Sequence, residues 1–128
     1  MVDTKRYQEW LDKARRDLRS AEILYQHEGD YDAICYFCQQ VVEKYFKGFL
    51  LKHTAINQEG HNLLKLCKKA ALYDRNLEVF TKDCAFLNTY YIETRYPQED
   101  PLEVTEKDVQ ECIRIANTIV VHIDKTLG

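Results

Sequence analysis

The sequence predicts an all-α fold, an up-and-down bundle of about five helices in one domain spanning residues 1–128. Two observations support this fold class. The 128 residues include only four Gly and two Pro, too few for the frequent turns of a β-sandwich or barrel. Apolar side chains recur every three or four residues through most of the chain, which is the period of an amphipathic helix.

Composition and charge limit the class of protein. Apolar residues make up 45% of the chain and charged residues 30%, which is typical of neither a disordered nor a membrane-embedded protein. The N-terminal residues lack the apolar core of a secretory signal. Five cysteines without a disulfide-framework spacing indicate a reducing, cytoplasmic location. The net charge of -3 gives no general attraction to nucleic acid.

The first predicted helix begins near Tyr7 and is ended by Gly29, where a left-handed capping residue is usual. Basic side chains occupy most of its polar face. Its apolar stripe has helical spacing and consists of Tyr7, Trp10, Leu11, Ala14, Leu18, Ala21, Leu24 and Tyr25.

The second predicted helix runs from Tyr31 to Lys52, with Asp30 or Asp32 as its N-cap. A helix that is apolar on most of its circumference is either central or part of an interface. This surplus of apolar residues favours dimerisation. Gly48 costs about 1 kcal/mol in a helix relative to Ala, so we expect it to allow a neighbouring helix to approach closely. The broad apolar stripe comprises Ile34, Cys35, Phe37, Cys38, Val41, Val42, Tyr45, Phe46, Phe49 and Leu50.

A loop at residues 54–60 precedes a short predicted helix over residues 61–71. Asn76 is the expected cap of a fourth helix. The side chains that we expect to point inward from this helix are Leu77, Phe80, Cys84, Leu87, Tyr90 and Tyr91.

Two prolines, Pro97 and Pro101, mark the one stretch that cannot be helical throughout. This connector is acidic, since residues 93–111 carry seven acidic and two basic side chains. Thr105 and Asp108 have the spacing of a capping box. They predict that the last helix begins there and continues to the C-terminus.

Most familiar catalytic and metal-binding patterns are missing from the sequence. Cys35 and Cys38 have half of a metal-binding spacing, but they lie in an apolar helix without partner ligands, so core thiols are expected and no metal or other cofactor. The single serine, Ser20, disfavours a serine hydrolase. His61 stands at the start of the helix predicted over residues 61–71, where it would serve either as a neutral base or donor or as a local capping residue.

Two polar clusters remain as candidate sites. Gln40, Glu43, Lys44 and Lys47 share one face of the second helix, and Glu43 and Lys47 have the spacing of an ion pair. The second cluster, residues 90–97, combines tyrosines with one arginine. Such a group can stack on a base or bind a phosphate. The alternative is that the tyrosines pack in the core and the arginine caps the helix.

Together these motifs resemble the HEPN domain family (higher eukaryote and prokaryote nucleotide-binding). The resemblance covers almost the whole chain. It rests on four motifs in the right order, namely Trp10-x-x-x-Ala14-x-x-Asp17-Leu18, Tyr36-Phe37-Cys38-Gln39-Gln40-x-x-Glu43-Lys44-x-x-Lys47, His61-Asn62-Leu63 and Tyr91-x-x-x-Arg95-Tyr96-Pro97.

The resemblance implies a helical bundle, commonly a homodimer, encoded beside a minimal nucleotidyltransferase in a toxin–antitoxin-like pair. Many members of the family are ribonucleases that use an Arg followed by a His after four to six intervening residues. This chain departs from that motif. After Arg95, the three positions where the motif would place the His hold Asp100, Pro101 and Leu102 instead. Seven residues, one too many, separate Arg19 from His27 and Arg114 from His122.

We therefore expect a non-catalytic nucleotide- or RNA-binding module that pairs with a nucleotidyltransferase. Arg95, Tyr91 and Tyr96 would contact a phosphate or base, and the groove would be lined by Gln40, Lys44 and Lys47. One alternative is a metal-independent ribonuclease that uses a nonstandard acid or base, with Arg95 and His61 as candidates. Another is a purely structural protein that forms dimers or neutralises its partner.

Overall fold

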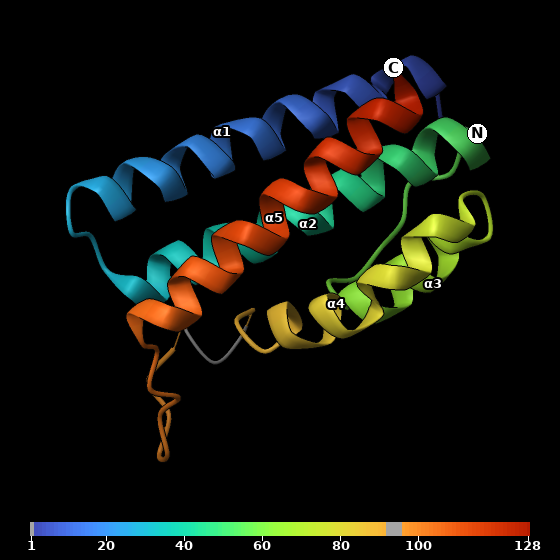
Figure 1. The fold of residues 1–128 in the computed structure, drawn as a ribbon. Coiled ribbons are helices and arrows are strands. Elements are labelled where there is room, and N and C mark those ends of the chain that lie inside the picture. The colour runs from blue at the N-terminus through green and yellow to red at the C-terminus, as the bar shows by residue number, and fades with distance from the viewer. Residues whose placement is uncertain (1, 92–95) are drawn as a thin grey trace.

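A computed structural model describes residues 2–91 and 96–128 of the chain. The described residues form five α-helices and no strand, which confirms the all-α prediction. Helices α1, α2 and α5 lie along one another, and α3 and α4 form a shorter pair at one side (Figure 1). The elements are η1 (Thr4–Arg6), α1 (Tyr7–Gln26), α2 (Tyr31–Thr54), α3 (Leu63–Ala71), η2 (Arg75–Phe80), α4 (Thr81–Asn88) and α5 (Glu106–Leu127), where η marks a 3-10 helix.

Helix α2 is the centre of the molecule, since α1, α3, α4 and α5 all contact it. Its Tyr45, Phe46 and Phe49 are completely buried. The broad apolar stripe of this helix is therefore covered within a single chain, except at Phe37, which is partly buried. A Cβ atom on Gly48 would lie 3.1 Å from the Tyr7 carbonyl oxygen and 3.0 Å from Leu11 Cδ2, so the expected close approach of a neighbouring helix is confirmed.

The turn between α1 and α2 differs from the prediction in one respect. Glu28, and not Gly29, adopts the left-handed conformation, with φ of 56°. The Gly29 N–H donates to the Leu24 carbonyl at 2.6 Å, as in a Schellman motif. A Cβ on Gly29 would lie 3.0 Å from the Leu24 carbonyl oxygen, a backbone atom, so the close approach of the two backbones favours glycine there. Asp30, the first of the two candidate caps, accepts a hydrogen bond from the Asp32 N–H.

The predicted start of the fourth helix at Asn76 is wrong. Asp74 is the capping residue, and its side chain accepts from the Asn76 N–H at 3.1 Å. Because this cap lies earlier, the chain first forms the 3-10 helix η2, and α4 begins only at Thr81. Leu77, Phe80 and the other expected inward residues up to Tyr90 are nevertheless buried.

The last helix begins as predicted. The Thr105 N–H donates to the Asp108 carboxylate at 3.1 Å, and the Asp108 N–H donates to Thr105 Oγ1 at 3.2 Å. The capping box is therefore confirmed. Over residues 2–91 and 96–128, no helix combines the length and the apolar content that crossing a membrane requires.

All five cysteines are free and buried, which confirms their prediction as core thiols. Burial raises the pKa of the Cys38 thiol, with further contributions from Cys35 and Glu22. Within the part of the chain that the structure describes, no three His, Cys, Asp or Glu side chains are grouped so that they would hold a metal ion.

Candidate functional site

A buried carboxylate on α2 organises the candidate site. The Glu43 side chain is only 4% exposed, so its charge must be met by nearby donors. Lys47 Nζ lies 3.2 Å from one carboxylate oxygen, which confirms the predicted i,i+4 pair. Gln39 Nε2 donates to the other oxygen at 3.3 Å. These contacts fix Glu43 in one orientation beneath the protein surface.

The third partner of Glu43 comes from the segment before α3. His61 Nδ1 lies 3.1 Å from both carboxylate oxygens. Gln39 Nε2 also donates to the His61 carbonyl at 3.3 Å, so both the ring and the backbone of His61 are attached to α2. A neutral imidazole that donates through Nδ1 keeps Nε2 as an acceptor. The side chain is 49% exposed, and this ring is therefore accessible to solvent.

Local capping explains why His61 reaches this position. Asn62, the next residue, caps α3 by accepting from the Leu64 and Lys65 N–H groups. The Leu63 N–H donates to Asn88 Oδ1 at 2.9 Å. The start of α3 is thus tied to the end of α4, just before Tyr91. Capping is done by Asn62, and His61 is held by Glu43 instead.

Three aromatic rings form a row above this cluster. The Tyr91 ring stacks on the His61 ring, with centroids 4.4 Å apart and an interplanar angle of 17°. On α2, the Tyr36 ring stacks on Tyr91 with a centroid distance of 6.3 Å. Both tyrosines are half-buried. The row therefore presents partly exposed aromatic surface supported by a buried ionic cluster.

The remaining predicted site residues lie in different environments. Lys47 is buried between Glu43 and Trp10, whose ring centroid is 5.6 Å from Nζ. Lys44 is half-buried and forms an ion pair with Asp17 of α1. The Gln40 amide donates to Gln39 Oε1 at 2.7 Å. The structure thus brings Lys47 and Tyr91 to the Glu43 cluster and directs Lys44 toward α1.

The tyrosines of the second cluster also separate. Tyr90 is buried, and burial raises the pKa of its hydroxyl, with contributions from Cys112 and Asp108. Tyr96 is 56% exposed. Arg95 lies outside the described residues. The two interpretations of this cluster therefore apply to different tyrosines, since Tyr90 packs in the core and Tyr91 joins the aromatic row.

Sequence reasoning did not assign functional roles to Gln39, Tyr36 or Trp10. Tyr36 and Gln39 belong to the family motif on α2, so that motif could have identified them as candidate site residues. Trp10 is the only tryptophan in the chain, and it lies at the edge of an apolar stripe. That position is where an aromatic ring has one packed side and one accessible side.

Comparison with known proteins agrees with this fold. The family model of the HEPN domain matches residues 7–125. The chain therefore belongs to the HEPN domain family. No curated protein matches the chain.

Two solved structures are similar over almost their whole length. One is TT1696 from Thermus thermophilus, which is 29% identical, with a TM-score of 0.78, over 94% of this chain and 97% of that chain. The other is ST0689, described as an archaeal HEPN homologue, which is 26% identical, with a TM-score of 0.74, over 95% of this chain and 98% of that chain.

Proposed function

We propose that this protein is a non-catalytic HEPN module that binds nucleotides or RNA. The observation that carries the proposal is the stacked row formed by Tyr36, Tyr91 and His61. Partly exposed aromatic rings are suited to stacking on nucleic acid bases, at about 1–3 kcal/mol per base. The buried ionic cluster beneath the row keeps the His61 ring in place and reduces the entropy that binding would cost.

Within this proposal the residues have distinct roles. Tyr91 and Tyr96 contact the base, and Arg95 contacts a phosphate. Gln40, which donates to Gln39, lines the edge of this site on α2, whereas Lys44 pairs with Asp17 on the α1 side. Lys47, which is buried against Glu43, contributes from below by fixing the cluster that supports His61.

Calorimetric titration with ATP and with a short single-stranded RNA tests the proposal. We expect Tyr91→Ala to weaken binding about 5- to 150-fold, the loss of one stacked base, and Arg95→Ala to weaken it as well. Tyr73→Ala is the matched control, because Tyr73 is an exposed tyrosine just after the end of α3. No heat with either ligand, or equal binding by the wild type and Tyr91→Ala, would refute the proposal.

We further propose that the module acts as a cytoplasmic homodimer with a separately encoded minimal nucleotidyltransferase, in a toxin–antitoxin-like pair. Membership of the HEPN family supports this, and the five free cysteines suit a reducing compartment. Light scattering during gel filtration, with and without a nucleotidyltransferase encoded next to this gene, tests it. A monomer that forms no complex would contradict it. Tight complex formation without any nucleotide or RNA binding would favour a purely structural, partner-neutralising role.

The contact between Glu43 and His61 favours a second candidate function, a metal-independent ribonuclease. A carboxylate that holds Nδ1 leaves Nε2 able to accept the proton of a ribose 2′-hydroxyl. The 2′ oxygen would then bond to phosphorus, the bond from phosphorus to the 5′ oxygen would break, and the leaving oxygen would take a proton from water. The products are a 2′,3′-cyclic phosphate and a 5′-hydroxyl.

Cleavage of a labelled RNA in the presence of a chelator distinguishes the two candidates. A ribonuclease loses this activity in His61→Gln and keeps it in His27→Gln, a control histidine that is exposed at the end of α1. An intact substrate with the wild-type protein would exclude the ribonuclease and leave the binding module.

A further inference from the structure

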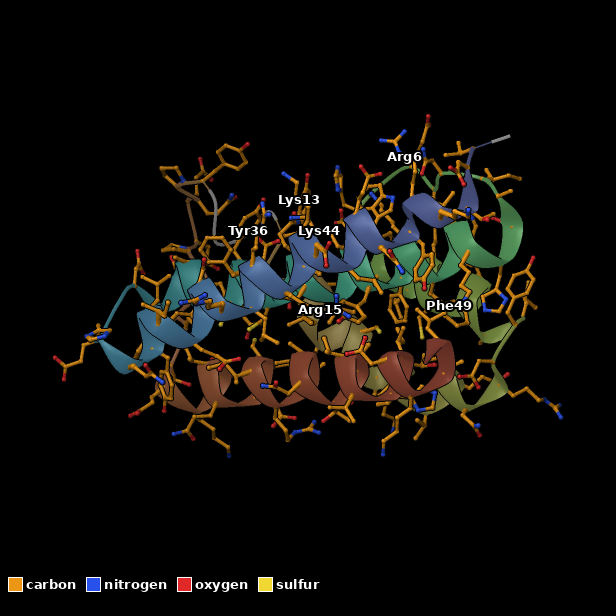
Figure 2. The ribbon with its side chains drawn as sticks, turned by 90° about the horizontal axis from the view of Figure 1, so that it is seen from above. Arg6, Lys13, Arg15, Tyr36, Lys44 and Phe49 are labelled. Atoms are coloured by element: carbon orange, nitrogen blue, oxygen red, sulfur yellow. The ribbon has the colours of Figure 1, made fainter. Side chains whose placement is uncertain are left out.

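A second candidate site lies between α1 and α2, away from the stacked aromatic row. A cavity of about 310 Å³ opens there and is bounded by η1 and by the segment after α2. Figure 2 labels three basic side chains along this edge of the molecule, Arg6 of η1, Lys13 of α1 and Lys44 of α2, and all three line the cavity. The lining also includes Trp10, Leu51 and Asn57.

The cavity combines two kinds of surface. Trp10 and Leu51 provide apolar contact, and the Asn57 amide can both donate and accept hydrogen bonds. The Trp10 ring is held in place from the protein side, because the buried Lys47 ammonium lies 5.6 Å from its centroid. An aromatic wall next to cations matches a planar base that carries phosphate groups.

The charges of the lining leave capacity for an anion. Arg6 contacts Glu9 at 2.6 Å, and both side chains are 63% exposed. Such exposed ion pairs contribute less than about 1 kcal/mol to the stability of the fold. A phosphate can therefore replace the Glu9 carboxylate as the partner of Arg6. Lys44 is paired with Asp17. Among the residues that the structure describes, Lys13 forms no ion pair and is exposed, which makes it the available cation.

We propose that this cavity binds a nucleoside phosphate, with the base against Trp10 and the phosphates on Lys13 and Arg6. The ligand class is the same as in the proposed function, but the nucleotide binds here in the Trp10 cavity and not at the Tyr91 row. A volume near the lower end of ligand cavities, which range from roughly 300 to 1,000 Å³, fits one nucleotide. That nucleotide is either free or the terminal nucleotide of an RNA strand.

The single tryptophan makes the test specific. Because Trp10 is the only tryptophan, its fluorescence reports this cavity and not the Tyr91 site. We expect ATP to change the emission in a saturable way, and adenosine and inorganic triphosphate each to bind more weakly than ATP. Lys13→Glu should weaken ATP binding about tenfold or more, since it places a like charge beside the phosphates. Lys82→Glu, the same charge change at an exposed position on α4, should leave the affinity within about twofold.

The outcomes separate this inference from the proposed function. Unchanged Trp10 emission, or equal ATP binding by Lys13→Glu and the wild type, overturns the cavity site even if calorimetry still finds Tyr91-dependent binding. A Trp10 response that depends on Lys13 but not on Tyr91 supports the cavity site, and calorimetry of Tyr91→Ala then decides separately whether Tyr91 also binds. A short RNA that competes with ATP for this response identifies a terminal nucleotide as the ligand, whereas a lack of competition identifies the free nucleotide.

Discussion

His61 Nδ1 lies 3.1 Å from each carboxylate oxygen of Glu43, a residue eighteen positions earlier in the chain. This contact joins the segment before α3 to the central helix. It also links the two candidate sites through Glu43. On one side Glu43 pairs with Lys47, which lies against the Trp10 ring. On the other side Glu43 contacts His61, which stacks on Tyr91. A change at Glu43 is therefore expected to affect both candidate sites.

The first prediction concerns Glu43→Gln. This variant preserves the shape of the side chain but removes the charge that compensates Lys47, whose side chain is only 7% exposed. We expect a loss of about 3–5 kcal/mol in the free energy of unfolding, the cost of leaving one member of a buried ion pair alone. Urea denaturation followed by circular dichroism measures this change.

A double variant provides the control. Glu43→Gln combined with Lys47→Met removes both charges, and most of the lost stability should return. If the double variant is as unstable as Glu43→Gln alone, the lost stability does not come from the uncompensated lysine.

The second prediction concerns Gly48→Ala. Alanine is favoured over glycine in a helix by about 1 kcal/mol, so an unconstrained site would become more stable. Here the new Cβ would lie 3.1 Å from the Tyr7 carbonyl oxygen and 3.1 Å from Trp10 Cβ. These atoms belong to α1 and cannot move without shifting that helix. We expect a net loss of about 1–2 kcal/mol, measured by thermal denaturation, and an increase in melting temperature would contradict it.

Much of this fold could be predicted from the sequence because the signals are local. The apolar periodicity, the capping box of Thr105 and Asp108, and the pair of Glu43 and Lys47 all involve residues within one helix. The cap at Asp74 was missed because Asp74 and Asn76 both suit an N-cap, and the 3-10 geometry of η2 has no strong pattern in the sequence.

The candidate site was less accessible to prediction because its contacts cross the fold. Glu43 and Lys47 were placed on one helix face, but periodicity alone did not indicate that Lys47 is buried. The approach of His61 to Glu43 depends on the path of the loop after α2. The stacking of Tyr91 on His61 joins the start of α3 to the segment after α4, which the hydrogen bond between Leu63 and Asn88 also connects. Because these contacts join residues that are far apart in the chain, no regular spacing in the sequence predicts them.

The third prediction is a pH dependence that originates at Asp74. Burial opposes ionisation of this carboxyl, but hydrogen bonds from His122 and the Asn76 backbone outweigh it and lower the pKa below its ordinary value of 3.8. A lowered pKa in the folded state means that the ionised carboxylate stabilises the fold. This contribution is fully present above the ordinary value and is lost as the pH falls through the lowered one.

The substitution Asp74→Asn isolates this effect. Asparagine keeps the oxygen that accepts from the Asn76 N–H but removes the charge that lies 2.7 Å from His122 Nε2. We expect the variant to be less stable near neutral pH by about 1–3 kcal/mol. The difference from the wild type should shrink as the pH falls below about 4. Urea denaturation at several pH values measures it, and a difference that does not depend on pH would show that the charge is not responsible.

The fourth prediction concerns the reactivity of the five cysteines. Each is at most 1% exposed, so none of the five thiols is accessible to a reagent in the folded protein. Burial also raises the pKa of the Cys38 thiol and makes its thiolate scarce. A thiol reagent should therefore modify the folded protein only at the rate at which it unfolds, whereas all five thiols should react at once in denaturant. Thr118→Cys, at an exposed position on α5, provides the positive control and should react immediately in the folded protein. Rapid reaction of any native cysteine would show that the core around it opens without global unfolding.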